Sequence, residues 1–329
     1  MTTANARSAT VSGRDGRRAV LGSWPTPLEP APRWAAALGL GPDDLWIKRD
    51  DLIGLGGGGN KARKLEFTLG AAVADEARTV VTSGAPQSNH ARLTAAAAAR
   101  CGVGAVLVLE GEEPDEPRGN LLLDRLLGAR LIWAGHVGPD LLAARVEQEA
   151  AALAAAGTPS AVIPFGGSSV LGARGYVAAG NELLAQTPEL TTVVVAVGSG
   201  GTMAGLVHAL GADRVLGVDT GAVDDGRDRV AGMVAGLADA TAAPEALRWN
   251  GNQVGAGYGT LTDPVREVLR RVARTEGIVL DPVYTGRAAA GLVEAVRDGS
   301  IRPGERTVFL HSGGLPGLFG HPDAVSLAD

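Results

Sequence analysis

Short runs of β-branched residues alternate with alanine- and leucine-rich stretches along most of this 329-residue chain. Continuous apolar runs such as Val193–Val197 are typical of strands that are buried on both faces of a sheet. The predicted strands are Leu45–Arg49, Thr79–Ser83, Ala105–Leu109, Arg130–Trp133, Ala161–Ile163, Thr192–Val197, Arg214–Val218 and Thr307–Leu310. The predicted helices between them cover about residues 61–76, 89–101, 118–127, 139–156, 172–186, 201–211, 262–275 and 286–298. Because such alternation builds βαβ units, we expect an α/β fold with parallel sheets.

The composition excludes several classes of protein. Hydrophobic residues make up 45% of the chain and charged residues 20%, which is the balance of a globular protein and not of a disordered one. The net charge of −6 gives no electrostatic footprint for nucleic acid or for an anionic membrane surface. The longest apolar runs fall far short of the roughly 20 residues that span a bilayer. We therefore expect neither nucleic-acid nor membrane partners.

The cysteine and histidine content argues against disulfides and metal sites. Cys101 is the only cysteine, so no intramolecular disulfide can form. The five histidines are scattered without a metal-ligand spacing, so no metal site is expected. The first 24 residues lack the apolar core of a signal peptide, and we expect them to form a mobile tail on a cytoplasmic protein.

Three glycine-rich loops stand at predicted strand–helix junctions: Gly54–Lys61, Ser83–His90 and Gly198–Thr202. Ligands of parallel α/β proteins bind at this edge of the sheet, where glycine permits close approach and helix N-termini attract anions. Gly198–Thr202 follows the best strand and is the best candidate for a phosphate site. The nucleotide-binding patterns fail, because Ala62 replaces the hydroxyl residue of a P-loop and Met203 replaces the third glycine of the dinucleotide fingerprint. A different phosphorylated cofactor is therefore expected.

Pyridoxal 5′-phosphate (PLP) is such a cofactor, and it needs a lysine amine for its Schiff base. Of 30 basic residues only Lys48, Lys61 and Lys64 are lysines. Lys48 lies beside an arginine and two aspartates, so we expect a paired structural cation, and Lys64, one turn beyond Lys61, is expected on the helix surface. Lys61 follows four glycines and Asn60 at a helix start, where the helix dipole and nearby arginines disfavour the protonated amine. These residues favour Lys61 as the Schiff-base lysine, with a structural role as the alternative.

Seven motifs, in order along residues 25–320, resemble those of one known family. They are Lys48–Phe67 (KRDDLIGLGGGGNKARKLEF), Ser83–Arg92 (SGAPQSNHAR), Pro164–Tyr176 (PFGGSSVLGARGY), Val197–Leu206 (VGSGGTMAGL), Gly255–Gly259 (GAGYG), Asp281–Leu292 (DPVYTGRAAAGL) and Phe309–Gly320 (FLHSGGLPGLFG). The chain is similar to the D-cysteine desulfhydrase and 1-aminocyclopropane-1-carboxylate (ACC) deaminase family. These are PLP enzymes with the fold of the tryptophan synthase β-subunit, known as fold type II.

The resemblance implies an organisation for the whole chain. It implies two open, twisted, mostly parallel sheets with helices on both faces, and PLP in the cleft between a large and a small domain. Residues 25–63 and 171–329 would form the large PLP-binding domain, and residues 64–170 the small one. The family also implies a homodimer. The segment 219–260 is the least regular part of the sequence, and we expect long loops over a site there.

The same resemblance assigns roles to single residues around the cofactor. Lys61 would carry the Schiff base, and Asn89 would hydrogen-bond the phenolic oxygen of PLP. The residues that would bind the phosphate are Gly198, Ser199, Gly200, Gly201 and Thr202.

Other residues would contact the substrate. Ser88 and Gln87, beside Asn89, would hold its carboxylate. Tyr258 and Tyr284, two of only three tyrosines in the chain, match the two active-site tyrosines of the family. His90 is expected to be a packing residue at the start of a helix.

Two positions distinguish activities within the family. Deaminase-type members carry Glu after the Tyr of the DPVY motif and Leu in the final glycine motif, where this chain has Thr285 and Ser312. The resemblance places Ser312 near the pyridine nitrogen, where a hydroxyl is the desulfhydrase-like pattern, and makes Thr285 a substrate contact. We therefore predict a PLP-dependent β-elimination that converts D-cysteine to pyruvate, sulfide and ammonia. The alternatives are a cysteate sulfo-lyase or related β-eliminating lyase, then an ACC deaminase, and, in a different class, a PLP- or amino-acid-binding protein without turnover.

Overall fold

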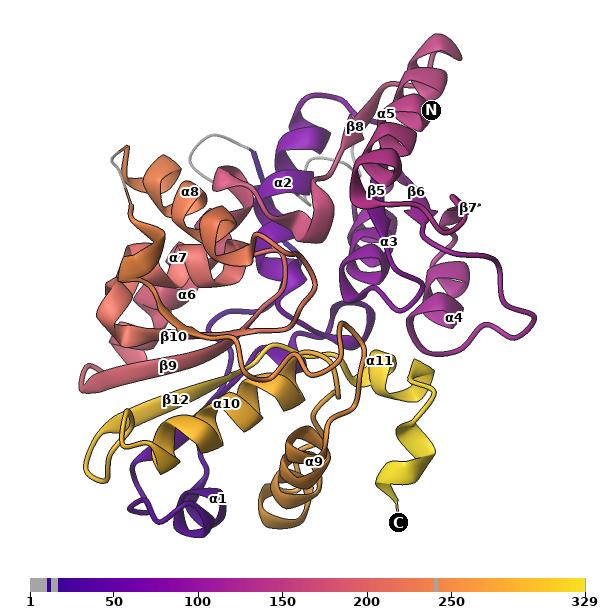
Figure 1. Ribbon diagram of the computed structural model, residues 1–329. Helices are drawn as coiled ribbons and strands as arrows, with labels where there is room; N and C mark the ends of the chain where they lie inside the picture. The colour runs from indigo at the N-terminus through magenta and orange to yellow at the C-terminus, as the bar shows by residue number, and fades with distance from the viewer. Residues whose placement is uncertain (1–10, 13–16, 240–241, 329) are drawn as a thin grey trace.

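The structure of the protein, a computed structural model, describes residues 11–12, 17–239 and 242–328. Two sheets form its framework (Figure 1). The larger sheet has the strand order β11 (Arg248–Asn250), β10 (Val215–Asp219), β9 (Leu190–Val197), β12 (Arg306–His311), β4 (Leu45–Arg49) and β3 (Leu28–Pro30). The smaller sheet has the order β7 (Arg130–Trp133), β6 (Gly104–Leu109), β5 (Thr79–Gly84) and β8 (Ser160–Val162). Neighbouring strands run parallel in both sheets, except for β3 and β4.

Helices cover the faces of these sheets. They are α1 (Pro32–Ala37), α2 (Lys61–Ala74), α3 (Asn89–Cys101), α4 (Gly119–Leu126), α5 (Pro139–Ala155), α6 (Val170–Gln186), α7 (Gly201–Leu210), α8 (Gly226–Ala238), α9 (Asp263–Glu276), α10 (Thr285–Arg297) and α11 (Leu315–Gly320). The predicted α/β fold with two mostly parallel sheets is confirmed, and every predicted strand lies within two residues of its observed bounds. Within the described ranges, no helix is long and apolar enough to cross a membrane.

Strand β9 shows why the larger sheet is buried on both faces. Its side chains alternate, so that Val193 and Val195 pack into the core beneath α6, α7 and α8, whereas Val194 packs into the core beneath α1, α9 and α10. All three side chains are fully buried. A strand with helices on both sides has no polar face, which accounts for the uninterrupted valine run in the sequence.

The smaller sheet is an insertion within the larger unit. Its strands lie between residues 79 and 162, and the chain enters it through α2 and leaves it through residues 163–170. Helix α2 packs against α6 of the larger unit and α3 of the smaller one, and it lies between the two sheets in Figure 1. The start of α2 is thereby held at the junction of the two units.

Two expectations about irregular segments need correction. The segment 219–260 is not a set of long loops, because it contains α8 and β11. The sequence did not predict this helix, because it is rich in glycine and charged residues. Its buried hydrophobic side chains are Val230 and Ala231, which pack against the larger unit. The mobile tail was expected through residue 24, but Arg18–Ala19 forms β2, paired with β1 (Val11–Ser12), and Leu21 is fully buried. Residues 1–10 and 13–16 lie outside the described part of the chain.

A buried ion network joins β4, α2 and α6. The amine of Lys48 donates to Glu182, which also accepts from Arg63. Arg63 donates in turn to Asp50 through two nitrogens, both at 2.8 Å. The expectation that Lys48 is a paired structural cation is therefore confirmed. Lys61 is the first residue of α2. The network therefore anchors α2 to the larger unit close to Lys61.

Candidate active site

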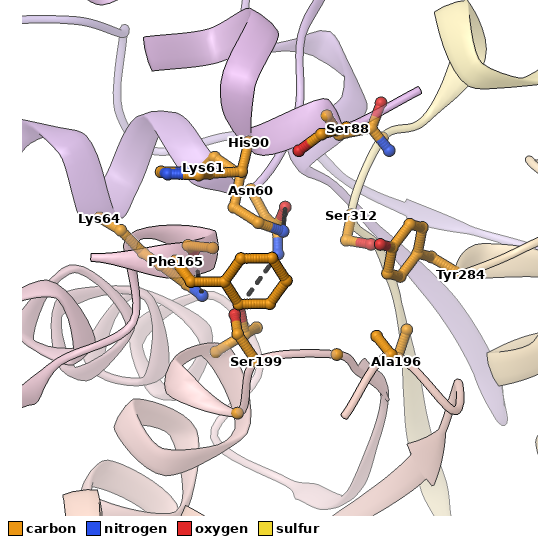
Figure 2. Close-up of a pocket in the computed structure, with 17 residues that line it drawn as sticks. Asn60, Lys61, Lys64, Ser88, His90, Phe165, Ala196, Ser199, Tyr284 and Ser312 are labelled. Carbon is orange, nitrogen blue, oxygen red and sulfur yellow. Dashed lines mark hydrogen bonds between the residues drawn. The ribbon is translucent and has the colours of Figure 1, made fainter. Parts of the chain in front are cut away.

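A pocket with an empty volume of about 640 Å³ lies between the two sheets. Its walls come from the starts of α2 and α3, the loop after β9 and the end of β12. The predicted site residues that line it are Lys61, Ser88, Asn89, Gly198, Ser199, Gly200, Thr202, Tyr284 and Ser312. Figure 2 shows Lys61 and His90 on one side of the pocket, with Tyr284 and Ser312 on the opposite side.

Lys61 reaches this pocket because of the glycine run that precedes it. Gly56–Gly59 all have positive φ, and a Cβ on Gly58 would lie 2.0 Å from the carbonyl oxygen of Asp51. Only glycine fits such a turn. It delivers Lys61 at the first position of α2, where its amine donates to Asn60 Oδ1 (3.0 Å) and lies 5.8 Å from the centre of the Tyr284 ring.

The surroundings of Lys61 favour the neutral amine. Burial lowers the pKa of Lys61 to about 8, and the positive charge of Arg92 acts in the same direction, whereas Asp281 opposes it. The ordinary lysine pKa is about 10.4, so roughly a tenth of Lys61 would be neutral at pH 7 instead of fewer than about one in a thousand. A neutral amine is the nucleophilic form.

We expect this shift to be measurable as the pH dependence of amine labelling. Labelling of Lys61 in the folded protein without cofactor should be half-maximal near pH 8, because the folded pKa is depressed and the neutral amine appears at lower pH. Peptide mass spectrometry after brief exposure to an amine reagent measures it, with the denatured protein as control. Equal midpoints for Lys61 in the folded and denatured protein would contradict the pKa assignment.

The loop after β9 forms an anion cradle. Gly200 has φ +91°, and α7 begins at Gly201, so the free N–H groups of the helix start face the pocket. In this structure Ser168 Oγ lies at the cradle, where it accepts from Gly201 N (3.1 Å) and hydrogen-bonds Ser199 Oγ (2.7 Å). A polar group therefore already uses two of the groups that a phosphate would contact, the Gly201 N–H and the Ser199 hydroxyl.

Lys64 is the cation of this cradle, and its predicted place on the helix surface is wrong. Its side chain is almost completely buried, and its amine donates to Ser168 Oγ (2.9 Å) and Gly166 O (3.2 Å). Burial holds the pKa of Lys64 well below its usual value, with the charge of Lys61 acting in the same direction. Within the described residues, no carboxylate forms an ion pair with it. A buried amine that lacks an anion, next to a helix start, is a site for a phosphate group.

The spacing of Lys64 from Lys61 could have predicted its position in the pocket. Lys61 and Lys64 are three residues apart, which places them on the same face of a helix. Once Lys61 is placed in the pocket, the spacing puts Lys64 beside it. Phe165 lines the pocket and Ser168 accepts a hydrogen bond from Lys64, and both come from a motif whose residues were given no role.

The start of α3 presents Ser88 and Asn89 to the pocket. Ser88 caps the helix by accepting a hydrogen bond from Ala91 N (3.1 Å). Asn89 Oδ1 accepts from Asn120 Nδ2 (2.9 Å) and more weakly from Arg92 (3.3 Å). Because its oxygen is occupied, Asn89 has its amide N–H groups left to offer to a ligand.

His90 is buried, as expected of a packing residue, and it also lines the pocket. Thr82 Oγ1 gives its proton to Ile163 O (2.8 Å), so its contact with His90 Nε2 (2.9 Å) requires that nitrogen to be the donor. Burial, followed by the charges of Lys61 and Lys64, holds the pKa of His90 well below its usual range. The imidazole is therefore neutral, with its Nδ1 lone pair free of any partner in the described structure.

A second pocket, with an empty volume of about 940 Å³, adjoins the first and shares Asn89 and Tyr284 with it. The remaining two predicted site residues that line a pocket, Gln87 and Tyr258, lie here. The hydroxyls of Tyr258 and Tyr284 are 2.7 Å apart. Burial is the main cause that raises the pKa of both phenols, so both are protonated at neutral pH.

Thr285 lies outside both pockets. It is fully buried, and its hydroxyl donates to Asp281 Oδ1 (2.6 Å). Asp281 also accepts from the backbone N–H groups of Val283, Tyr284 and Thr285, and thereby caps α10. Thr285 thus helps to fix the start of the helix beside Tyr284. Its contact with substrate stays a prediction, because Thr285 lines neither pocket.

Comparison with known proteins identifies the family. A sequence model described as "Pyridoxal-phosphate dependent enzyme" matches residues 20–313. The chain belongs to this family. A protein of Pyrococcus abyssi named "Putative 1-aminocyclopropane-1-carboxylate deaminase" is 41% identical over 318 residues, which are 92% of this chain and 93% of the relative. A protein of Pyrococcus horikoshii with the same name is 39% identical over 314 residues, with the same shares covered.

Solved structures share the fold of this chain. A crystal structure described as an ACC deaminase homologue superposes with a TM-score of 0.85 at 37% identity, over 94% of this chain and 96% of the other. A threonine deaminase isoform from Solanum lycopersicum, at 19% identity, a TM-score of 0.63 and coverage of 88% and 83%, shares the fold. The protein is therefore a PLP-dependent enzyme of fold type II and of the ACC deaminase and D-cysteine desulfhydrase type.

The residues of the pocket fit PLP in charge and in the chemical groups that they offer. The unpaired amine of Lys64 and the start of α7 match a phosphate dianion, and Lys61 supplies the amine that PLP requires. Among the described residues, no three His, Cys, Asp or Glu side chains gather into a metal site.

Proposed function

We propose that the protein catalyses β-elimination on a small sulfur-bearing amino acid, with D-cysteine as the substrate and pyruvate, sulfide and ammonia as products. The observation that carries this proposal is the absence of any carboxylate among the residues that line the catalytic pocket. Ser312 lies at the end of β12 in that lining, and Thr285 stands where deaminase-type members carry Glu. A hydroxyl holds the ring nitrogen of PLP less firmly protonated than a carboxylate does, which favours elimination over transamination.

The residues of the pocket have separate tasks in binding. Lys64, Ser199 and the backbone of Gly200–Thr202 would hold the phosphate, and the Asn89 amide would donate to the phenolic oxygen. The Ser88 hydroxyl, with Gln87 beside it, would bind the substrate carboxylate. When bound, the cofactor supplies a ring that takes up the electron pair left when the Cα–H bond of the substrate breaks.

The protons are moved by Lys61 and the tyrosine pair. Lys61, freed when the substrate amine takes its place, accepts the Cα proton, and its lowered pKa suits a base at neutral pH. The Cβ–S bond then breaks with its electron pair leaving on sulfur. The hydrogen-bonded hydroxyls of Tyr258 and Tyr284 supply a proton to that sulfur. Addition of water to the released product yields pyruvate and ammonia, so no external oxidant or reductant is needed.

ACC deaminase activity is the second candidate, because it is favoured by the names of the similar Pyrococcus proteins. Opening the cyclopropane ring requires proton delivery to a carbon that carries no leaving group. The same two tyrosines could donate there, so the geometry of the proton donors alone does not separate the two reactions.

A panel of substrates separates them. We expect pyruvate and sulfide from D-cysteine, and no 2-oxobutyrate from ACC, when the holoenzyme is assayed with D-cysteine, L-cysteine, cysteate, β-chloro-D-alanine and ACC. Pyruvate from cysteate without sulfide from D-cysteine would move the assignment to a sulfo-lyase, and 2-oxobutyrate from ACC would overturn it. A yellow protein that turns over none of these compounds would be a binding protein.

A further inference from the structure

Arg92 is a buried guanidinium that binds no carboxylate in the described part of the chain. It lies on α3, one turn after Asn89, and is fully buried. Its NH1 donates to the carbonyl oxygens of Gly56 and Gly58, both at 2.8 Å. Its Nε donates to Asn120 Oδ1 (3.0 Å), and its NH2 donates to Asn89 Oδ1 (3.3 Å). One side chain thus reaches the loop that carries Lys61, the start of α3 and the start of α4.

Asn120 completes this arrangement from α4. It is fully buried, and its Nδ2 donates to Asn89 Oδ1 and to Gln87 O, both at 2.9 Å. Its backbone N–H donates to Gln87 Oε1 (2.9 Å). Asn120 therefore uses both ends of its amide, with the oxygen on Arg92 and the nitrogen on the start of α3. We call Arg92 and Asn120 together the amide clamp.

Such a buried cation is costly unless the arrangement serves another purpose. The carboxylate whose charge acts on Arg92 is Asp124, which lies one helical turn after Asn120 on α4. Neither oxygen of Asp124 has a hydrogen-bond partner in the described structure. Arg92 directs its donors to two backbone carbonyls and two side-chain amides instead. Burial of polar groups in a network fixes one geometry of its members.

We propose that the amide clamp positions Asn89 for PLP. Arg92 and Asn120 occupy the Asn89 oxygen, so that its N–H groups point to the phenolic oxygen of the cofactor. Arg92 also holds the Gly56–Gly58 loop that presents Lys61. The proposal rests on the predicted contact of Asn89 with PLP, and not on which amino acid is the substrate. Both members are positioning residues, because neither lines the pocket.

The positive charge of Arg92 acts on the same site. After burial, the charge of Arg92 is the second cause that lowers the pKa of Lys61, while Asp281 raises it. The other titratable groups around Lys61 are Lys64, His90 and Tyr284, which line the same pocket. The clamp thus joins the two groups that meet the cofactor on this side, Asn89 and Lys61.

A double-mutant cycle tests the positioning role. Asn89→Ala, Asn120→Ala and the double variant are compared with the parent by the PLP dissociation constant and by the pH midpoint of the visible band of the holoprotein. We expect Asn120→Ala to raise the dissociation constant about tenfold, as loss of a hydrogen bond to a charged oxygen does. Its midpoint should shift in the same direction as that of Asn89→Ala. In the Asn89→Ala background, Asn120→Ala should add nothing, because it acts through Asn89.

Two further variants control for folding. Asn120→Asp keeps an acceptor for Arg92 but loses the donor to Asn89, so it should reproduce the effect of Asn120→Ala while retaining the clamp's link to α3. Thr94→Val changes a fully buried hydroxyl on α3 that has no partner in the described structure, and it should leave both measurements unchanged. Additive effects in the cycle, or an Asn120→Asp protein with the parent's dissociation constant and midpoint, would overturn the proposal. Neither readout depends on turnover, so a wrong substrate assignment cannot imitate either result.

Discussion

Replacement of Lys61 by Ala should abolish both the imine absorbance band of the PLP-loaded protein and its turnover. The variant loses the amine that bonds the cofactor and the base that takes the Cα proton, so we expect turnover to fall by ~10³-fold or more. Since the remaining lysines, Lys48 and Lys64, are buried and hydrogen-bonded elsewhere, neither can take its place. Absorbance spectra and pyruvate release measure the two losses.

Lys61→Arg is the matched control for charge. It keeps a cation at the start of α2, but a guanidinium forms no imine with an aldehyde, so the imine band should be lost as in Lys61→Ala. PLP should still be retained without covalent attachment, because the cradle and Lys64 are intact, and the variant should then show the band of the free aldehyde. An imine band that survives in either variant would refute the assignment of Lys61.

Replacement of Lys64 by Met should weaken PLP binding by about 100-fold. Methionine is close to lysine in length but has no charge, so the variant removes the buried amine that we assign to the phosphate, a loss of about 3 kcal/mol. The free energy of unfolding of the cofactor-free protein should change by no more than about 1 kcal/mol, because that amine has no ion-pair partner to lose among the described residues. Equilibrium titration with PLP and urea unfolding of the cofactor-free variant measure the two quantities.

Lys48→Met is the matched control for a buried lysine. It breaks the pair with Glu182, and neither residue lines the pocket, so it should lower the free energy of unfolding and leave the PLP dissociation constant of the folded protein unchanged. Should Lys64→Met instead destabilise the cofactor-free protein as much as Lys48→Met and bind PLP normally, Lys64 would be a structural residue.

The sequence predicts the sheets well because the apolar runs of their strands can be recognised without knowledge of the tertiary structure. The valine run of β9 is read correctly because burial on both faces removes the polar alternation, and the glycine run before Lys61 requires a tight turn in any fold. The helix α8 was missed because its residues have weak helix propensity and gain their stability from packing on the larger unit, which no local pattern reveals.

The site was predicted less completely, for a similar reason. Roles for Lys61, Ser88, Asn89 and the loop after β9 were assigned from motifs. Lys64 lies in the same motif as Lys61 but was placed on the surface, because its spacing from Lys61 indicates a buried position only once Lys61 itself is placed in the pocket. Asn120 lies 31 residues beyond Asn89 and on a different helix, and their contact exists only through the fold of the smaller unit. Contacts of this kind are decided by tertiary structure.

Because the smaller sheet is an insertion, two connections of the chain join it to the larger unit. One connection carries Lys64 and the other carries Ser168, and the two side chains are hydrogen-bonded to each other. Ser168 is also bonded to Ser199 in the larger unit. A rotation of one sheet against the other would therefore have to break or reform the contacts of the anion cradle. An anion bound at the cradle would compete with Ser168 for these contacts, which tie both connections of the smaller unit to the larger one.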